Sequence, residues 1–135
     1  MAGYSATPLA KKLGIKPGFK MRLINAPDYY FDLFTDLPSN VRILKDRKAK
    51  KNFIHFFATS ITDLEKNIIA LKNEIEQDGI IWVSWYKKSS GITTDVTESN
   101  IRETALAIGL VDIKVCAVDE FWSGLKLVIP VKNRI

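Results

Sequence analysis

Two short, almost uninterrupted apolar runs constrain the fold more than any other feature of the sequence. They are Phe53–Ala58 and Ile80–Trp85. Runs of this kind are typical of central strands covered on both faces, which occur mainly in parallel sheets. Apolar residues at helical spacing lie between them, at Ile61, Leu64, Ile68, Leu71 and Ile75. A strand, a helix and a second buried strand in this order indicate an α/β fold.

The flanking segments extend this alternation. Further strands are predicted at Lys20–Asn25, Val41–Leu44, Asp112–Val118 and Leu125–Val131, the last two as an antiparallel hairpin. Further helices are predicted at Pro8–Leu13, Tyr29–Leu37 and Glu98–Ile108. The central helix is expected to begin at Ser60 or Thr62 and to stop at Asp78-Gly79.

These elements predict one α/β domain over residues 1–135, with residues 1–19 as an N-terminal arm. The expected architecture is an open, mostly parallel twisted sheet of about six strands, with helices on both faces. Ligands of such sheets bind beyond the carboxyl ends of the strands. The edge strands leave the oligomeric state open.

Composition excludes several classes of protein. No run of 18 apolar residues exists, so we expect no membrane-spanning helix and no membrane partner. The N-terminus has neither the basic start nor the apolar core of a secretory signal. The single cysteine, Cys116, excludes an internal disulfide, and a cytoplasmic location fits best. One histidine and one cysteine argue against a zinc site, and we expect no metal.

The net charge of +5 is unevenly distributed. Residues 1–52 carry 11 basic and 4 acidic side chains, whereas residues 53–135 carry 9 basic and 11 acidic ones. The basic side chains gather in the N-terminal arm and in Lys45–Lys51. Such a patch attracts phosphate polymers, although solvated charged loops are common. A nucleic-acid partner is therefore one alternative.

The second half of the chain resembles a Rossmann-like methyltransferase. The resemblance rests on Gln77–Ser84, where a glycine turn leads into a buried strand, on Ile108–Val111, and on the hairpin at Val115–Ile129. It implies an S-adenosylmethionine site after the first strand, with Asp46 in the place of a ribose-binding acid. The glycine-rich loop of that family is replaced by Asn25-Ala26-Pro27. A proline there removes a backbone N–H donor.

Over its whole length, the chain resembles a family of small bacterial proteins, a domain of unknown function. The matching segments are Tyr4–Gly14, Trp82–Lys88 and Val115–Leu125, with Tyr86 in a position where the family has proline. This resemblance implies no particular activity, substrate or catalytic residue.

The predicted ligand site is a cleft at the carboxyl ends of the strands. Its residues are Asn25, Thr59, Trp85, Lys87, Lys88 and Ser90. The ammonium and hydroxyl groups of the segment at 87–91 suit a phosphate or carboxylate, and an exposed tryptophan suits a flat ring. An ordinary polar surface loop is the competing interpretation.

Other reactive side chains are interpreted as structural. His55 lies mid-strand between apolar residues and is expected in the core with one satisfied nitrogen. Cys116 is expected to be buried and inert. Asp119 and Glu120 are adjacent and would point to opposite faces, so paired acid–base chemistry is not expected.

The leading hypothesis is a non-catalytic module that binds a small anionic ligand or a protein partner, without a cofactor. The first alternative is an atypical methyltransferase using S-adenosylmethionine beside Asn25 and Asp46. The second is a nucleic-acid binder using the basic N-terminal half, whose affinity would fall steeply with salt.

Overall fold

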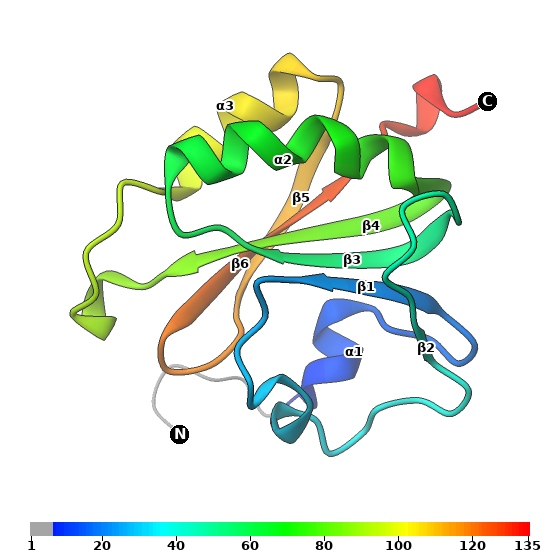
Figure 1. Ribbon diagram of the computed structural model, residues 1–135, viewed down its shortest axis with the longest axis horizontal. Helices are drawn as coiled ribbons and strands as arrows, with labels where there is room; N and C mark the ends of the chain where they lie inside the picture. Colours follow the sequence, from blue (N-terminus) through cyan, green and yellow to red (C-terminus); the bar gives the residue numbers. More distant parts are fainter. Residues whose placement is uncertain (1–6) are drawn as a thin grey trace.

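The computed structural model describes residues 7–135; residues 1–6 of the predicted arm lie outside the described part. Six strands form one sheet in the order β2-β1-β3-β4-β6-β5 (Figure 1). Their bounds are β1 Lys20–Ile24, β2 Arg42–Ile43, β3 Lys51–Phe57, β4 Ile75–Tyr86, β5 Val111–Ala117 and β6 Trp122–Val128. Strands β2, β1, β3 and β4 are parallel, and β6 and β5 add an antiparallel hairpin. The predicted sheet is confirmed.

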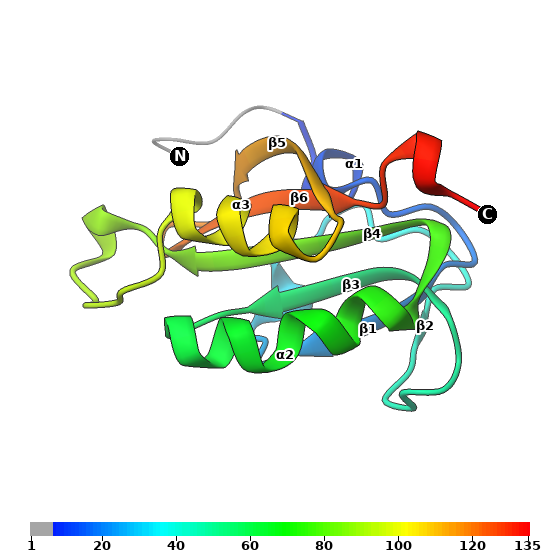
Figure 2. The same cartoon turned by 90° about the horizontal axis from the view of Figure 1, so that it is seen from above.

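Helices cover both faces of this sheet (Figure 2). On one face, α2 Ile61–Glu74 and α3 Glu98–Ala107 pack on apolar side chains of β3, β4 and β6. On the other face, α1 Leu9–Leu13 and the 3-10 turn η1 Tyr30–Leu33 enclose a second core. The central strands β3 and β4 contribute to both cores, which explains their nearly continuous apolar sequence. Two further 3-10 turns are η2 Lys88–Ser90 and η3 Val131–Asn133.

Helix boundaries follow from local capping. The Ser60 hydroxyl accepts a hydrogen bond from the backbone N–H of Asp63 and begins α2, which decides between the two predicted caps. Thr97 begins α3 through a reciprocal capping box with Asn100. After α3, Gly109 adopts a φ of 86°, a left-handed conformation that favours glycine.

Two predicted helix bounds are wrong. The helix expected at Tyr29–Leu37 is only the short turn η1, because Phe34 is already extended while Tyr30 turns into the core. Helix α2 ends at Glu74, before the expected stop, because Ile75 enters β4 opposite Lys51.

The predicted turn at Asp78-Gly79 exists as an irregularity inside β4. Pairing with β3 jumps from Ile75 to Ile80 while β3 advances only from Lys51 to Phe53. A Cβ at Gly79 would lie 2.9 Å from the carbonyl oxygen of Glu76, so the chain passes itself too closely for a side chain.

Candidate functional site

A pocket of about 740 Å³ opens beyond the carboxyl end of β4. Its wall begins with the last residues of the strand, Trp85 and Tyr86, and continues through the following loop to the start of α3. The remaining lining residues are Lys88, Gly91–Thr94 and Val96–Ser99. This position agrees with the rule that open α/β sheets bind ligands beyond their carboxyl edges.

Aromatic side chains form the rigid side of the pocket. The Tyr86 ring stacks on Trp122 with centroids 4.0 Å apart, and Trp122 meets Phe57 edge to face. Trp85 packs partly against the α2–α3 core and keeps part of its surface exposed. A half-exposed indole held by a core offers a flat ligand a fixed surface for stacking.

Hydrogen bonds hold the loop on the opposite side. The Ser90 hydroxyl donates to the carbonyl of Lys87 at 2.7 Å and accepts from the N–H of Ile92. The Thr94 hydroxyl donates to the carbonyl of Thr59 at 2.9 Å. The backbone N–H of Lys87 donates to the carbonyl of Phe121. The loop is therefore attached to β3 and to the β5–β6 turn.

The six predicted site residues divide into three groups. Trp85 and Lys88 line the pocket. Thr59, Lys87 and Ser90 brace its loop through the hydrogen bonds just described. The remaining residue, Asn25, bonds instead to the side chain of Asp63 in the first turn of α2, at 3.3 Å.

The sequence reasoning missed Tyr86 and the threonines Thr93, Thr94 and Thr97 as lining residues of the pocket. The sequence signal that could have found them is the run of threonines before the predicted start of α3. The loop that leads into this helix begins at the carboxyl end of β4, so its residues lie at the same edge of the sheet as the pocket.

The segment after β1 does not form an open turn. Asn25 has a φ of 57°, a left-handed conformation in a residue other than glycine, and Pro27 follows two residues later. The Tyr29 hydroxyl donates to Asp119 at 2.7 Å, which joins this segment to the β5–β6 turn. Burial, the hydrogen bond and the carboxylate charge of Asp119 raise the pKa of Tyr29 above its usual range.

Asp46 lies at the other end of the sheet from Asn25. Its carbonyl accepts a hydrogen bond from the side chain of Lys51, the first residue of β3. Asn25 directly follows Ile24, which pairs with Phe56 near the other end of β3. Lys51 and Phe56 are five residues apart along β3, which corresponds to about 17 Å in a strand. The two residues that the methyltransferase alternative assigned to one cofactor are therefore held apart.

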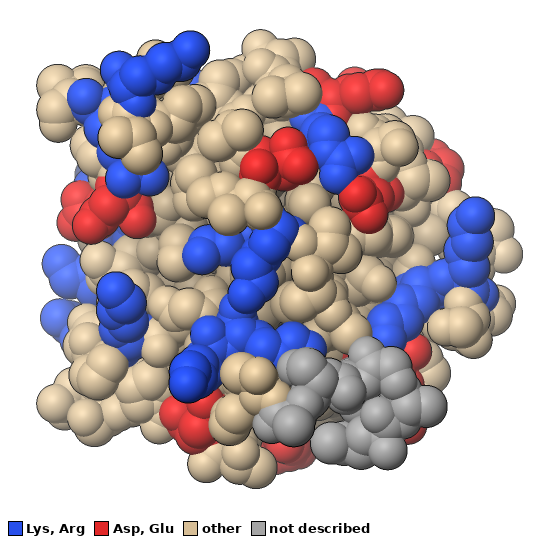
Figure 3. Space-filling model, turned by 180° about the vertical axis from the view of Figure 1, so that it is seen from behind, with Lys and Arg blue, Asp and Glu red and all other residues tan. Residues whose placement is uncertain are grey.

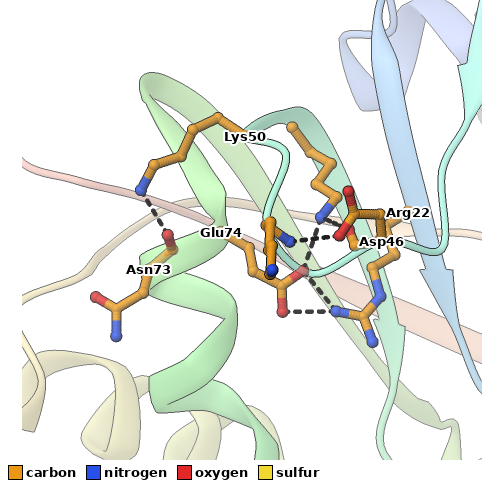
Figure 4. A network of polar contacts seen from close by, with 7 residues as sticks. Arg22, Asp46, Lys50, Asn73 and Glu74 are labelled. Atoms are coloured by element: carbon orange, nitrogen blue, oxygen red, sulfur yellow. Dashed lines mark hydrogen bonds and ion pairs between the residues drawn. The ribbon is translucent and has the colours of Figure 1, made fainter.

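The basic run at 45–51 is not one exposed patch. Lys51 is fully buried and bonds to Glu74, which also pairs with Arg22 (Figure 4). The Lys50 ammonium group donates to the carbonyl of Asn73 at 2.6 Å. The last two lysines of the run thus attach the β2–β3 connection to the end of α2, while Lys45, Arg47, Lys48 and Lys50 remain exposed.

His55 lies in the core, as predicted, but both of its ring nitrogens have partners. Nδ1 lies 3.0 Å from the Tyr30 hydroxyl, and Nε2 lies 2.7 Å from the Ser84 hydroxyl. The imidazole also stacks on Phe57. Burial lowers the pKa of His55 to about 3. All three polar residues are inaccessible to a substrate, so this serine–histidine contact is structural.

Cys116 departs from its predicted burial. It lies on the edge strand β5 and is only half-buried, because no strand of the described residues covers its outer side. Burial still raises the pKa of its thiol, and the nearby Lys12 and Lys114 partly oppose that effect. Asp119 is buried and accepts the backbone N–H groups of Phe121 and Trp122 at 2.8 Å, so its carboxylate stabilises a turn.

Residues 7–135 contain no group of three histidine, cysteine or acidic side chains that could hold a metal ion. This is the part of the chain that the structure describes. None of its helices is long and apolar enough to cross a membrane.

The sheet order, the C-terminal hairpin and the carboxyl-edge pocket define a methyltransferase-like α/β protein. The profile of one protein family matches residues 46–131, which is more than half of the chain. The chain belongs to this family, described as "Protein of unknown function (DUF3052)".

Solved structures with the same fold are methyltransferases. A proposed type 11 methyltransferase from Sulfolobus solfataricus has a TM-score of 0.63 and 17% identity, covering 93% of this chain and 91% of its own. Ribosomal protein L11 methylase from Lactobacillus delbrueckii subsp. bulgaricus has a TM-score of 0.60 and 10% identity, covering 89% and 74%. The DhpI–SAH complex has a TM-score of 0.57 and 10% identity, covering 88% and 79%. At these identities the likeness establishes the fold. No curated protein matches the chain.

Proposed function

We propose that this protein is a non-catalytic ligand-binding module built on a methyltransferase-type scaffold. Its ligand is a small anionic molecule with a flat ring, bound in the pocket beyond β4. The observation that carries this proposal is that the partly exposed Trp85 and the exposed Lys88 both line this pocket. A ring stacked on the indole would place an attached anionic group within reach of a cation.

The segment after β1 supports a role other than methyl transfer. A dinucleotide-type site needs close backbone approach and free N–H donors at this turn. Here Asn25 engages Asp63, and Pro27 lacks an N–H. No cofactor is part of this proposal, and no residue of the pocket is assigned a catalytic role.

A thermal-shift titration tests the ligand class. Adenosine monophosphate is the probe, because it combines a flat ring with a phosphate. At 100 times its Kd, a ligand stabilises the folded state by about 2.7 kcal/mol, which raises the Tm of a domain of this size by about 10 °C. We expect a saturable rise that Trp85→Ala and Lys88→Gln each reduce. Lys66→Gln, on the exposed side of α2, is the charge-matched control. A rise that survives both pocket variants would contradict the proposed site, and no rise at millimolar probe would contradict the ligand class.

The methyltransferase fold itself favours a second candidate, an atypical S-adenosylmethionine-dependent methyltransferase. The same titration with S-adenosylmethionine and S-adenosylhomocysteine distinguishes it. A saturable shift that Asn25→Trp abolishes and Lys88→Gln leaves intact would replace the first proposal with this one. A flat response to both compounds would remove it.

A further inference from the structure

A cluster of four lysines lies on the face of the sheet opposite α2 and α3. Lys114 on β5 and Lys126 on β6 are directly paired across the hairpin. Two more lysines lie near this pair. The charge of Lys16, which follows α1, acts on the ammonium group of Lys126. The charge of Lys12, in α1, acts on the thiol of Cys116 in β5. We call Lys12, Lys16, Lys114 and Lys126 the hairpin lysine cluster.

The edge of α1 sets the position of this cluster. The indole N–H of Trp82 donates to the carbonyl of Leu13 at 2.8 Å, so α1 covers the sheet as far as β4. Lys126 pairs with Trp82 on the next strand, and its Nζ lies 3.8 Å from where a Cβ of Gly14 would be. The cluster therefore begins where the helix stops covering the sheet.

The charges of the cluster are not neutralised within the described chain. None of its four lysines forms an ion pair with a carboxylate among residues 7–135. Lys12 instead donates to the carbonyl of Ala117 at 2.8 Å. Like charges placed directly opposite each other on neighbouring strands destabilise a sheet. Burial is the main cause that lowers the pKa of Lys126, and the positive charges of Lys114 and Lys16 lower it further. A bound anion would relieve it.

The surrounding surface is open and basic. Figure 3 shows a band of Lys and Arg side chains running down the middle of the face opposite α2. The four lysines come from three segments, which are α1 with the turn that follows it, β5 and β6, and Lys16 and Lys114 are exposed. Lysine offers a point charge rather than the planar fork with which arginine reads base edges. Several point charges on an open face suit a chain of phosphates more than a single small anion.

We propose that the hairpin lysine cluster binds the sugar–phosphate backbone of a nucleic acid, without sequence preference. This surface is separate from the pocket beyond β4, so either proposal can fail alone. It shares Lys12 and Lys16 with the basic N-terminal arm of the predicted nucleic-acid alternative, but it uses the hairpin lysines in place of the run at 45–51, of which Lys51 is buried.

Fluorescence anisotropy with a labelled duplex of about two helical turns, about 20 base pairs, tests the proposal. The affinity is measured from about 50 to about 200 mM salt. Four phosphate contacts predict a slope of log K against log salt of about −3.6, and Lys114→Gln with Lys126→Gln should reduce its magnitude by about 1.8. This double variant should fold at least as stably as the parent, because it removes a repulsive pair.

The charge-matched control is Lys45→Gln with Lys66→Gln, two exposed lysines outside the cluster. We expect this control to retain the parental slope. Equal weakening by both double variants would overturn the proposal, because it would show a net-charge effect. The proposal would also fail if the duplex did not bind at about 50 mM salt, or if phosphatidylserine vesicles bound and the duplex did not.

Discussion

The ammonium group of Lys51 lies 3.0 Å from Glu74 Oε1, although the lysine side chain has no exposed surface. Both oxygens of Glu74 also accept from Nη1 of Arg22 at 2.5 Å. The carboxylate thus neutralises cations from β1 and β3 at the point where α2 passes directly into β4. These contacts attach the end of α2 to β1 and β3.

Removing Glu74 should destabilise the protein strongly. We expect Glu74→Ala to lower the free energy of unfolding by about 3–5 kcal/mol, because it leaves a buried ammonium group without its counter-charge. Urea denaturation measures the change. The matched control, Lys51→Met with Glu74→Gln, removes both charges and should recover a large part of the loss. Equal destabilisation by the single and double variants would contradict this account.

His55 should make stability depend on pH. Its pKa is about 3 in the folded protein and 6.5 in an unfolded chain, so only the unfolded state takes up a proton between these values. The free energy of unfolding should be constant above pH 6.5 and should fall by about 1.4 kcal/mol per pH unit below it. Urea denaturation from about pH 5 to about 7.5, where most carboxylates stay ionised, measures the slope. His55→Asn should flatten it, and a parental slope in that variant would assign the effect to other groups.

Trp85 should account for most of the quenchable tryptophan fluorescence. Trp82 is fully buried and Trp122 is 5% exposed, whereas Trp85 is half-exposed in the pocket wall. We expect Trp85→Phe to remove most of the acrylamide-quenchable emission and Trp122→Phe to leave it. A large quenchable fraction remaining in Trp85→Phe would show that the pocket wall differs from the one described.

Asn25 should tolerate glycine better than alanine. A φ of 57° is unfavourable for a residue with a Cβ, and Asn25→Ala should cost about 1 kcal/mol while Asn25→Gly stays near neutral. Asn40, with a φ of 61°, is the matched position because it has the same conformation at the edge of the sheet. Thermal unfolding of the four variants measures both costs. If the Asn25→Ala variant were as stable as the Asn25→Gly variant, this would argue against the left-handed conformation of Asn25.

The strands were predictable because their apolar patterns match their burial. Phe53–Phe57 and Ile80–Trp85 lie in the two central strands. The antiparallel hairpin was also predicted, but its second strand begins at Trp122 rather than Leu125, because Ser123 and Gly124 pair with β5 instead of forming the turn. The segment after Asp28 was harder, because a stripe of Tyr30, Leu33 and Phe34 suits either a helix or an irregular packed turn. The hydrogen bond from Tyr30 to His55, 25 residues away in sequence, favours the turn.

The site was predictable only in part. The carboxyl-edge rule led to Trp85 and Lys88, because a strand end can be located from an apolar run. It also selected Asn25, since the rule does not say which strand ends share a pocket. Which strand ends share a pocket depends on contacts between distant segments, such as the hydrogen bond from the side chain of Asn25 to that of Asp63.

The position of Lys114 on an outer strand has a consequence for self-association. Within residues 7–135, strand β5 has β6 on one side and no strand on the other, and its Ile113 and Val115 are exposed. An apolar edge of this kind is a template for pairing with a second copy. Two copies joined along β5 would bring two lysine-bearing hairpins together. The positive charge that would attract a polyanion therefore also opposes the pairing of two copies along β5.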